Sequence, residues 1–330
     1  MKKVINKPET YVEDMLKGIY AAHGDMVKCA DDDLRCYCTA KKRSGKVAIV
    51  TGGGTGHLPL FLGYVGEGLI DGCGVGGVFQ SPAPEQIYKI CKEVESGAGV
   101  LFLYGNYTGD IMTFDMASDL CEMDDIVCRS IVGADDVNSH EDPNVRRGVA
   151  GIYFMFKSAG ARADEGGDLE EVLAAAQLAK DNTRTVGFAL TPCVIPEVGH
   201  PNFELGENEM AMGMGIHGEP GIWNGSLKTS RKIAEESLQT LLTDMPVAEG
   251  EEVAILINGL GATSLEELYI LSNDITELLQ ERQIRIFRTI VGEYATSMEM
   301  AGASISICKI NDELRRYLLH PVHTPFICQK

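Results

Sequence analysis

The stretch KVAIVTGGGTGH, residues 46–57, decides the fold class, because an apolar, β-branched run passes directly into a row of glycines. Such a run, bounded by glycines, is typical of a buried strand. Consecutive glycines permit positive φ angles and let backbone N–H groups approach a ligand closely. In α/β sheets, ligands usually bind at the carboxyl ends of strands. The stretch therefore predicts an α/β protein with a binding loop at this point. The predicted binding residues are Gly53, Gly54, Thr55, Gly56 and His57.

This glycine-rich loop does not match the common nucleotide-binding patterns. No Gly-Lys-Ser/Thr follows it, as a P-loop requires, and the third glycine of the dinucleotide fingerprint is missing at the required spacing. These differences argue against a nucleotide-dependent dehydrogenase. A tight strand-to-helix turn with a surface histidine is the alternative interpretation of the loop taken alone.

Outward from this loop, strand-like and helical segments alternate along the chain. PEQIYKICKEVES (84–96) begins with proline and places its apolar residues on one face, and LEEVLAAAQLAKDN (169–182) is also helical in pattern. This alternation predicts an α/β architecture, and 330 residues are enough for two domains. We place the boundary after the second helix, which gives a first domain over 1–183 and a second over 184–330. The predicted strands cover 46–53, 99–106, 125–133, 184–190, 252–259, 284–292 and 303–310.

Charge and composition exclude several classes of partner. The formal net charge of −19 argues against nucleic acid or an anionic membrane, because both are polyanions. No stretch approaches the roughly 20 apolar residues of a membrane span, and the N-terminus lacks the apolar core of a secretory signal. The ten cysteines are scattered, which suits reduced thiols of the cytoplasm. Cys36 and Cys38 have no second pair at zinc-finger spacing, so no metal site is predicted.

A second polar loop, LYGNYTGD (103–110), ends another predicted strand at Asp110. One interpretation of this aspartate is the N-cap of the helix that follows. The other is a carboxylate that accepts a proton from a substrate hydroxyl or orients it. The residues alone leave both interpretations open.

A third loop, MGMGIHGEPGI (212–222), places His217 among glycines on both sides. This mixture is poor for a helix or a core, and a histidine without bulky neighbours is free to touch a ligand. A neutral imidazole nitrogen can attack a carbonyl. A structural histidine is the alternative, but together the loops of His57 and His217 predict a site for a small polar metabolite.

As a set, the motifs GGGTGH, NYTGD, GIHGEPG, NGLGATSLEELY and PVHTP, in this order, resemble the dihydroxyacetone kinase K subunit (DhaK) family. The resemblance covers essentially the whole chain and includes lesser segments such as RRGVAG (146–151). It implies two α/β domains with mixed sheets flanked by helices, in a cytoplasmic homodimer. It also implies a C-terminal tail that returns to the first domain.

The resemblance further implies a chemistry for the three loops. His217 matches the histidine that holds dihydroxyacetone covalently as a hemiaminal, and His57 with Asp110 matches the acid/base pair. No cofactor is expected on this chain itself. ADP or ATP with Mg²⁺ is expected on a separate DhaL-type subunit, and the phosphoryl donor is either a phosphotransferase-system protein or ATP.

Two residues depart from the family pattern. Leu58 stands where the family commonly has Glu, and Gly105 where it commonly has Lys. Both changes remove a charge near the substrate loops, so we expect an altered or enlarged pocket. A four-carbon ketose such as erythrulose is therefore an alternative substrate. A non-catalytic ketone-sensing coactivator is a further alternative, although the retained His57 and Asp110 favour an enzyme.

Overall fold

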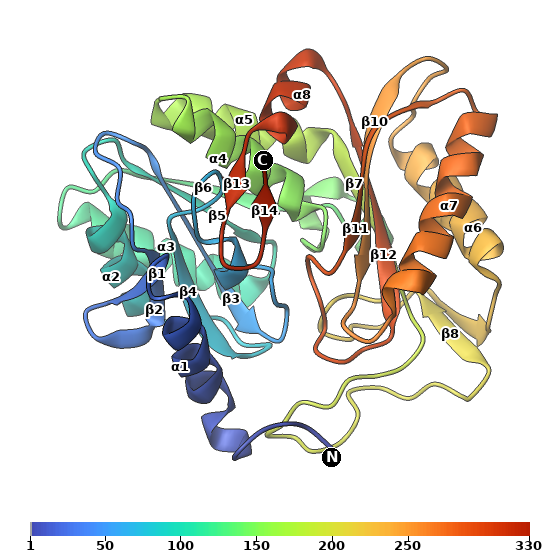
Figure 1. The fold of residues 1–330 in the computed structure, drawn as a ribbon, viewed down its shortest axis with the longest axis horizontal. Helices are drawn as coiled ribbons and strands as arrows, with labels where there is room; N and C mark the ends of the chain where they lie inside the picture. The colour runs from blue at the N-terminus through green and yellow to red at the C-terminus, as the bar shows by residue number, and fades with distance from the viewer. Residues whose placement is uncertain (1) are drawn as a thin grey trace.

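Two six-stranded sheets form the two lobes of the molecule, as the computed structural model of residues 2–330 shows (Figure 1). The first sheet has the order β1-β2-β4-β3-β5-β6 and the second the order β11-β10-β12-β7-β8-β9. The strands of the first sheet are β1 (Val27–Ala30), β2 (Asp33–Thr39), β3 (Ala48–Thr55), β4 (Gly72–Val78), β5 (Val100–Gly105) and β6 (Cys128–Gly133). Those of the second are β7 (Thr183–Ala189), β8 (Glu209–Met212), β9 (Trp223–Ser226), β10 (Glu252–Gly259), β11 (Arg285–Gly292) and β12 (Gly302–Lys309).

Both sheets are mixed, which confirms the predicted fold class. In the first sheet β3, β4, β5 and β6 pair in parallel, while β2 joins β4 in the antiparallel sense. In the second, β10 and β11 are parallel and the remaining pairs are antiparallel. Parallel neighbours bring the carboxyl ends of β3, β5 and β6 to one edge of the sheet, and the loops of His57 and Asp110 leave from that edge.

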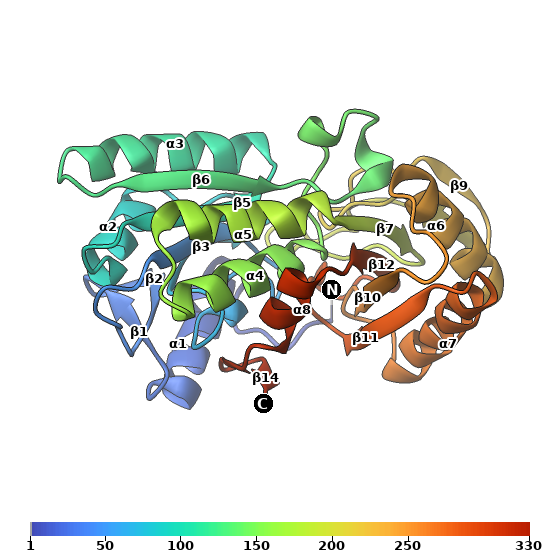
Figure 2. The same cartoon turned by 90° about the horizontal axis from the view of Figure 1, so that it is seen from above.

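Helices cover both faces of the first sheet (Figure 2). Phe102 of β5 packs with α2 and α3, while Leu101 and Leu103 belong to the core on the opposite face, with α4 and α5. Successive side chains point to opposite faces of a strand, so a strand buried on both faces reads as a continuous apolar run. The helices are α1 (Tyr11–His23), α2 (Pro84–Val94), α3 (Thr108–Glu122), α4 (Ile152–Asp164), α5 (Leu169–Asp181), α6 (Ser230–Asp244), α7 (Leu265–Glu281) and α8 (Asp312–Leu319). Four short 3₁₀ helices are η1 (Pro8–Thr10), η2 (Leu62–Tyr64), η3 (Val137–Ser139) and η4 (Pro143–Val145).

The C-terminal segment runs from the second lobe to the first. After α8 it forms the small hairpin of β13 (Val322–His323) and β14 (Cys328–Gln329). The backbone of His323 exchanges hydrogen bonds with that of Glu67, and the Thr324 hydroxyl donates to the carbonyl of Gly63 at 2.8 Å. The second sheet begins at Thr183, and a domain division after residue 183 remains our prediction. No helix among residues 2–330 is long and apolar enough to cross a membrane.

Candidate functional site

The predicted strand 46–53 is β3, which continues to Thr55, so that Gly52, Gly53 and Gly54 lie inside the strand and Gly56 follows it. A side chain on Gly53 would place its Cβ atom 2.2 Å from the ring of Phe61. At Gly54 the Cβ would lie 2.7 Å from the backbone of Phe79 and Gln80. These close approaches by neighbouring loops require glycine whether or not a ligand is bound.

His57, the last residue of this loop, is buried, and its hydrogen bond fixes its tautomer. Its Nδ1 donates to the carbonyl of Thr296 at 2.8 Å, because a carbonyl oxygen can only accept. The Nε2 atom therefore keeps its lone pair, and it is buried with no hydrogen-bond partner among residues 2–330. Burial, with a smaller effect of the neighbouring His217, lowers the pKa of His57 to about 3. At neutral pH this imidazole is an uncharged acceptor.

Asp110 lies in the first turn of α3, three residues after the N-cap position at Tyr107. The capping interpretation of Asp110 is therefore wrong. Its Oδ1 is buried and lacks a hydrogen-bond partner within the described part of the chain. Burial raises the pKa of Asp110 to about 6, although Ser81 and His217 act in the opposite direction. A buried carboxylate with an unused oxygen is suited to receive a substrate hydroxyl.

His217 reaches the same place from the second lobe, in the loop between β8 and β9. Its ring centroid lies 4.7 Å from that of His57, with an interplanar angle of 82°. Two aromatic rings of the first lobe also pack edge-on against it, Tyr107 at 4.8 Å and Phe79 at 5.2 Å. The structure therefore brings together the two histidines that the sequence predicted.

A carboxylate fixes the tautomer of His217 as a carbonyl does for His57. The Nδ1 atom lies 2.9 Å from Oε1 of Glu219, and the backbone N–H of His217 donates to Oε2 of Glu219 at 2.9 Å. With Nδ1 committed to an acceptor, the lone pair of the neutral ring is on Nε2. The side chain of His217 is 23% exposed, whereas His57 is 1% exposed. His217 is thus the more accessible of the two nucleophilic nitrogens.

Comparison with known proteins shows the family of the chain. The model of the Dak1 domain family matches residues 17–326. The chain belongs to the Dak1 domain family. It is 43% identical, over 95% of each chain, to "PTS-dependent dihydroxyacetone kinase 1, dihydroxyacetone-binding subunit DhaK" of Listeria innocua.

Two further related proteins have names that state different functions, a kinase and a co-activator. The Dak1 chain is 40% identical to "D-erythrulose kinase" of Mycolicibacterium smegmatis, over 98% of this chain and 56% of that one. It also resembles the solved structure of "Dihydroxyacetone kinase operon co-activator Dha-DhaQ", with a TM-score of 0.88 and 32% identity over 94% of this chain and 96% of that one. The fold of the Dak1 chain is therefore shared by proteins named as kinase subunits and by one named as a coactivator.

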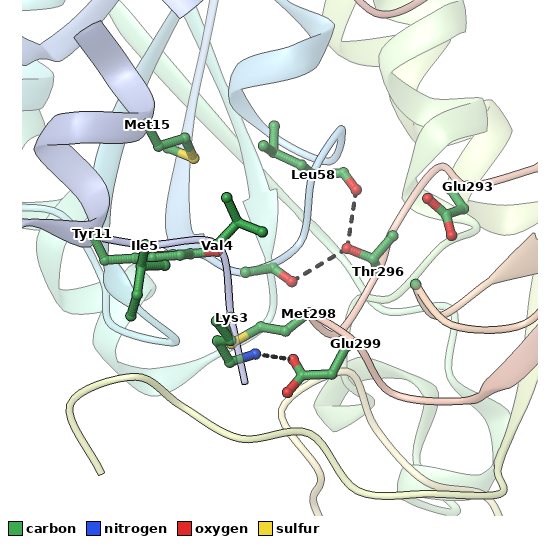
Figure 3. Close-up of a pocket in the computed structure, with 12 residues that line it drawn as sticks. Lys3, Val4, Ile5, Tyr11, Met15, Leu58, Glu293, Thr296, Met298 and Glu299 are labelled. Atoms are coloured by element: carbon green, nitrogen blue, oxygen red, sulfur yellow. Dashed lines mark hydrogen bonds and ion pairs between the residues drawn. The ribbon is translucent and has the colours of Figure 1, made fainter. Parts of the chain in front are cut away.

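Leu58, the first departure from the family pattern, lines a cavity beside the His57 loop (Figure 3). This cavity of about 390 Å³ lies between the N-terminal segment, α1 and the β11–β12 connection. Neither His217 nor Asp110 lines it. The backbone carbonyl of Leu58 accepts a hydrogen bond from the Thr296 hydroxyl at 3.0 Å, so Leu58 helps to hold the loop on which His57 lies.

Gly105, the second departure, leaves room for an aromatic ring. A Cβ atom at this position would lie 2.9 Å from the ring of Tyr107, which packs against His217. The space next to Gly105 is therefore filled by Tyr107, which forms part of the wall of the site.

Several residues of the site were not predicted from the sequence of this Dak1 chain. Glu219 belongs to the quoted GIHGEPG motif, and its place two residues after His217 could have indicated it. The sequence around Thr296 and the sequence around Phe79 contain no motif that would indicate a place in the site. Phe79 has a φ of 57°, which is uncommon for a residue with a bulky side chain, and its ring stacks on His57 at 4.9 Å.

Proposed function

We propose that this Dak1 chain binds dihydroxyacetone, or a related short ketose, and presents its terminal hydroxyl for phosphorylation. One observation carries the proposal. His57 and His217 both have Nδ1 bound to an acceptor, and among residues 2–330 neither Nε2 of His57 nor Oδ1 of the nearby Asp110 has a hydrogen-bond partner. The names of the related kinase subunits support the choice of substrate class.

His217 is the proposed covalent anchor. Its Nε2 lone pair attacks the ketone carbon, so that a C–N bond forms and the π electrons of the carbonyl move to oxygen. The oxygen takes up a proton from solvent, and the Nδ1 proton leaves to solvent by way of the Glu219 carboxylate, which ends ionised as it began. The product is a neutral hemiaminal formed without loss of water. Glycerol has no carbonyl carbon, so this step distinguishes ketoses from polyols.

His57 and Asp110 are the proposed acid/base pair. The hydroxyl that attacks phosphorus must lose its proton, and both Nε2 of His57 and the carboxylate of Asp110 are free to accept it. Covalent attachment holds this hydroxyl in one place. Correct positioning supplies much of the catalysis of phosphoryl transfer.

The phosphoryl donor is proposed to lie on a second protein. The sequence has no P-loop, and in our proposal a DhaL-type subunit carries ADP or ATP with Mg²⁺. The chain itself is proposed to act in the cytoplasm as a homodimer, without a bound cofactor. Whether a phosphotransferase-system protein or ATP supplies the phosphoryl group can be tested by adding each to the same assay.

The test of this function is intact mass spectrometry without borohydride, with dihydroxyacetone added. Wild type should gain the mass of one dihydroxyacetone with no loss of water, and His217→Ala should gain nothing. An unchanged adduct in His217→Ala would remove His217 from its role. No adduct in wild type, with turnover intact, would exclude the covalent step.

Two alternatives follow from particular relatives. The D-erythrulose kinase suggests a four-carbon ketose, and comparing rates on dihydroxyacetone and both erythrulose enantiomers decides between the substrates. A clear preference for dihydroxyacetone would exclude the four-carbon alternative. The DhaQ likeness suggests a coactivator, which would bind the ketone but transfer no phosphoryl group with a DhaL-type subunit.

A further inference from the structure

Arg147 of the RRGVAG segment lies between two carboxylates at the junction of the lobes. Its guanidinium contacts Asp136 of the first lobe at 2.8 Å and approaches Glu219 of the second at 3.8 Å. It also donates to the carbonyl of Gly213 at 3.0 Å, at the start of the loop that carries His217. Arg147 therefore connects the first lobe to the His217 loop at two points.

Glu219 transmits this contact to the imidazole. One carboxylate oxygen faces Nδ1 of His217 and the other accepts the backbone N–H of the same residue. Burial alone would raise the pKa of Glu219, yet its hydrogen bond to His217 and the nearby Arg147 guanidinium hold the pKa of this carboxyl below its usual range. An ionised carboxylate accepts from Nδ1 more strongly than a neutral one.

We propose that Arg147 is a positioning residue for His217. By holding Glu219 as the acceptor of the Nδ1 proton, it keeps the lone pair of His217 on Nε2, where the ketone carbonyl is attacked. This inference rests on the proposed function. As the C–N bond forms, positive charge develops on the imidazole, and Glu219, oriented by Arg147, lies beside that charge.

The neighbouring Arg146 supplies a matched control. It is also buried, at 3% exposure of its side chain, and it also joins the lobes, through Asp244 at the end of α6 at 2.6 Å. Its other hydrogen bonds go to the carbonyls of His140 and Glu141, away from His217 and Glu219. Arg146→Met thus removes a bridge between the lobes without changing the surroundings of His217.

The first experiment compares rates of adduct formation with dihydroxyacetone. Arg147→Met should slow the rate by about tenfold, because it removes the positive charge 3.8 Å from Glu219 and the hydrogen bond to the Gly213 carbonyl at the start of the His217 loop. Arg147→Lys should recover part of the rate because it restores the charge. Arg146→Met should keep the wild-type rate within about twofold even where its melting temperature falls. Equal slowing in Arg146→Met and Arg147→Met would show a merely structural role and overturn the proposal.

A double-mutant cycle tests the route through Glu219. Glu219→Gln should slow adduct formation by itself, and adding Arg147→Met should then have little further effect. If the two substitutions slowed adduct formation in a fully additive way, Arg147 would not act through Glu219, and the proposal would be overturned.

The second experiment needs no ligand, so it separates this inference from the proposed function. Long-range ¹H–¹⁵N spectra of ¹⁵N-histidine-labelled protein report the tautomer of His217, with His217→Ala used for assignment. Wild type should carry the proton on Nδ1, and Arg147→Met should show a mixture of tautomers. An unchanged tautomer in Arg147→Met would overturn the inference even if the adduct forms. Failure of wild type to form the adduct would instead contradict the proposed function.

Discussion

At the scale of single residues, burial acts on the two proposed acid/base groups in opposite directions. It lowers the pKa of His57 to about 3 and raises that of Asp110 to about 6, so both effects favour the uncharged form. Asp110 must be ionised to accept a proton. We therefore expect the rate of ketose phosphorylation, with saturating partner, to fall about tenfold per pH unit below about pH 6. Steady-state rates between about pH 4.5 and 8 check this.

The control for that profile is Asp110→Asn, which cannot titrate at this position. It should retain the covalent adduct but transfer phosphoryl groups poorly at every pH. A wild-type profile that stays flat through pH 6, or normal turnover by Asp110→Asn, would remove Asp110 from the acid/base pair.

The same pKa makes a prediction about stability. Because the folded-state pKa of Asp110 lies above its unfolded value, the ionised carboxylate destabilises the fold above about pH 6, and this cost vanishes as the pH falls towards about 4. Asp110→Asn should therefore raise the free energy of unfolding by about 1–3 kcal/mol at about pH 7.5. Urea titrations at about pH 7.5 and 4 measure the difference. An equal increase in the free energy of unfolding at both pH values would contradict the electrostatic explanation.

The residues that carry chemistry were predictable where the chain places them in glycine-rich loops. His57, Asp110 and His217 were found in this way. Thr296 was not, because it lies 239 residues from His57 and binds it through a backbone carbonyl, which any residue type possesses. Arg147 was quoted only within a motif, since its contacts with Asp136 and Glu219 depend on how the lobes meet.

At the scale of elements, β3 shows how packing restricts a glycine-rich strand. Gly53→Ala should lower the free energy of unfolding by about 1–3 kcal/mol, because its Cβ would lie 2.2 Å from the Phe61 ring. Gly18→Ala is the control, since a Cβ there meets nothing within 4 Å and the residue lies inside α1. That change should stabilise the protein by about 0.5–1 kcal/mol. Urea unfolding measures the free energy of unfolding of both variants. An equal change in Gly53→Ala and Gly18→Ala would contradict the packing argument.

Elements with a strong periodic pattern were predicted well. The helical segment 84–96 is α2 (Pro84–Val94), and 169–182 is α5 (Leu169–Asp181). The glycine-rich β4, with the sequence GCGVGGV, was missed because glycine has no side chain to give the alternation of a strand. β8 and β9 were missed because strands of four residues are too short to show a period.

At the scale of the whole molecule, the site exists only where the two lobes meet. The sequence predicted two α/β units and a common site for His57 and His217, but not which surfaces of the units pack together, since these surfaces are assembled from distant segments. One core cluster contains Ile49 and Leu101 of the first sheet together with Ala254 and Leu256 of the second. A shared core of this kind couples the stability of the lobes.

We therefore expect both lobes to unfold in one cooperative transition. Native-state hydrogen exchange should give similar free energies of opening for β5, inside the first sheet, and β10, inside the second, because neither strand can open without breaking the shared core. In urea, the fluorescence of Trp223, the single tryptophan of the chain, should follow the circular dichroism of the whole protein. Opening of β10 at a clearly lower free energy than β5 would mean that the lobes unfold separately. His217 would then lose contact with His57 before the first lobe unfolds.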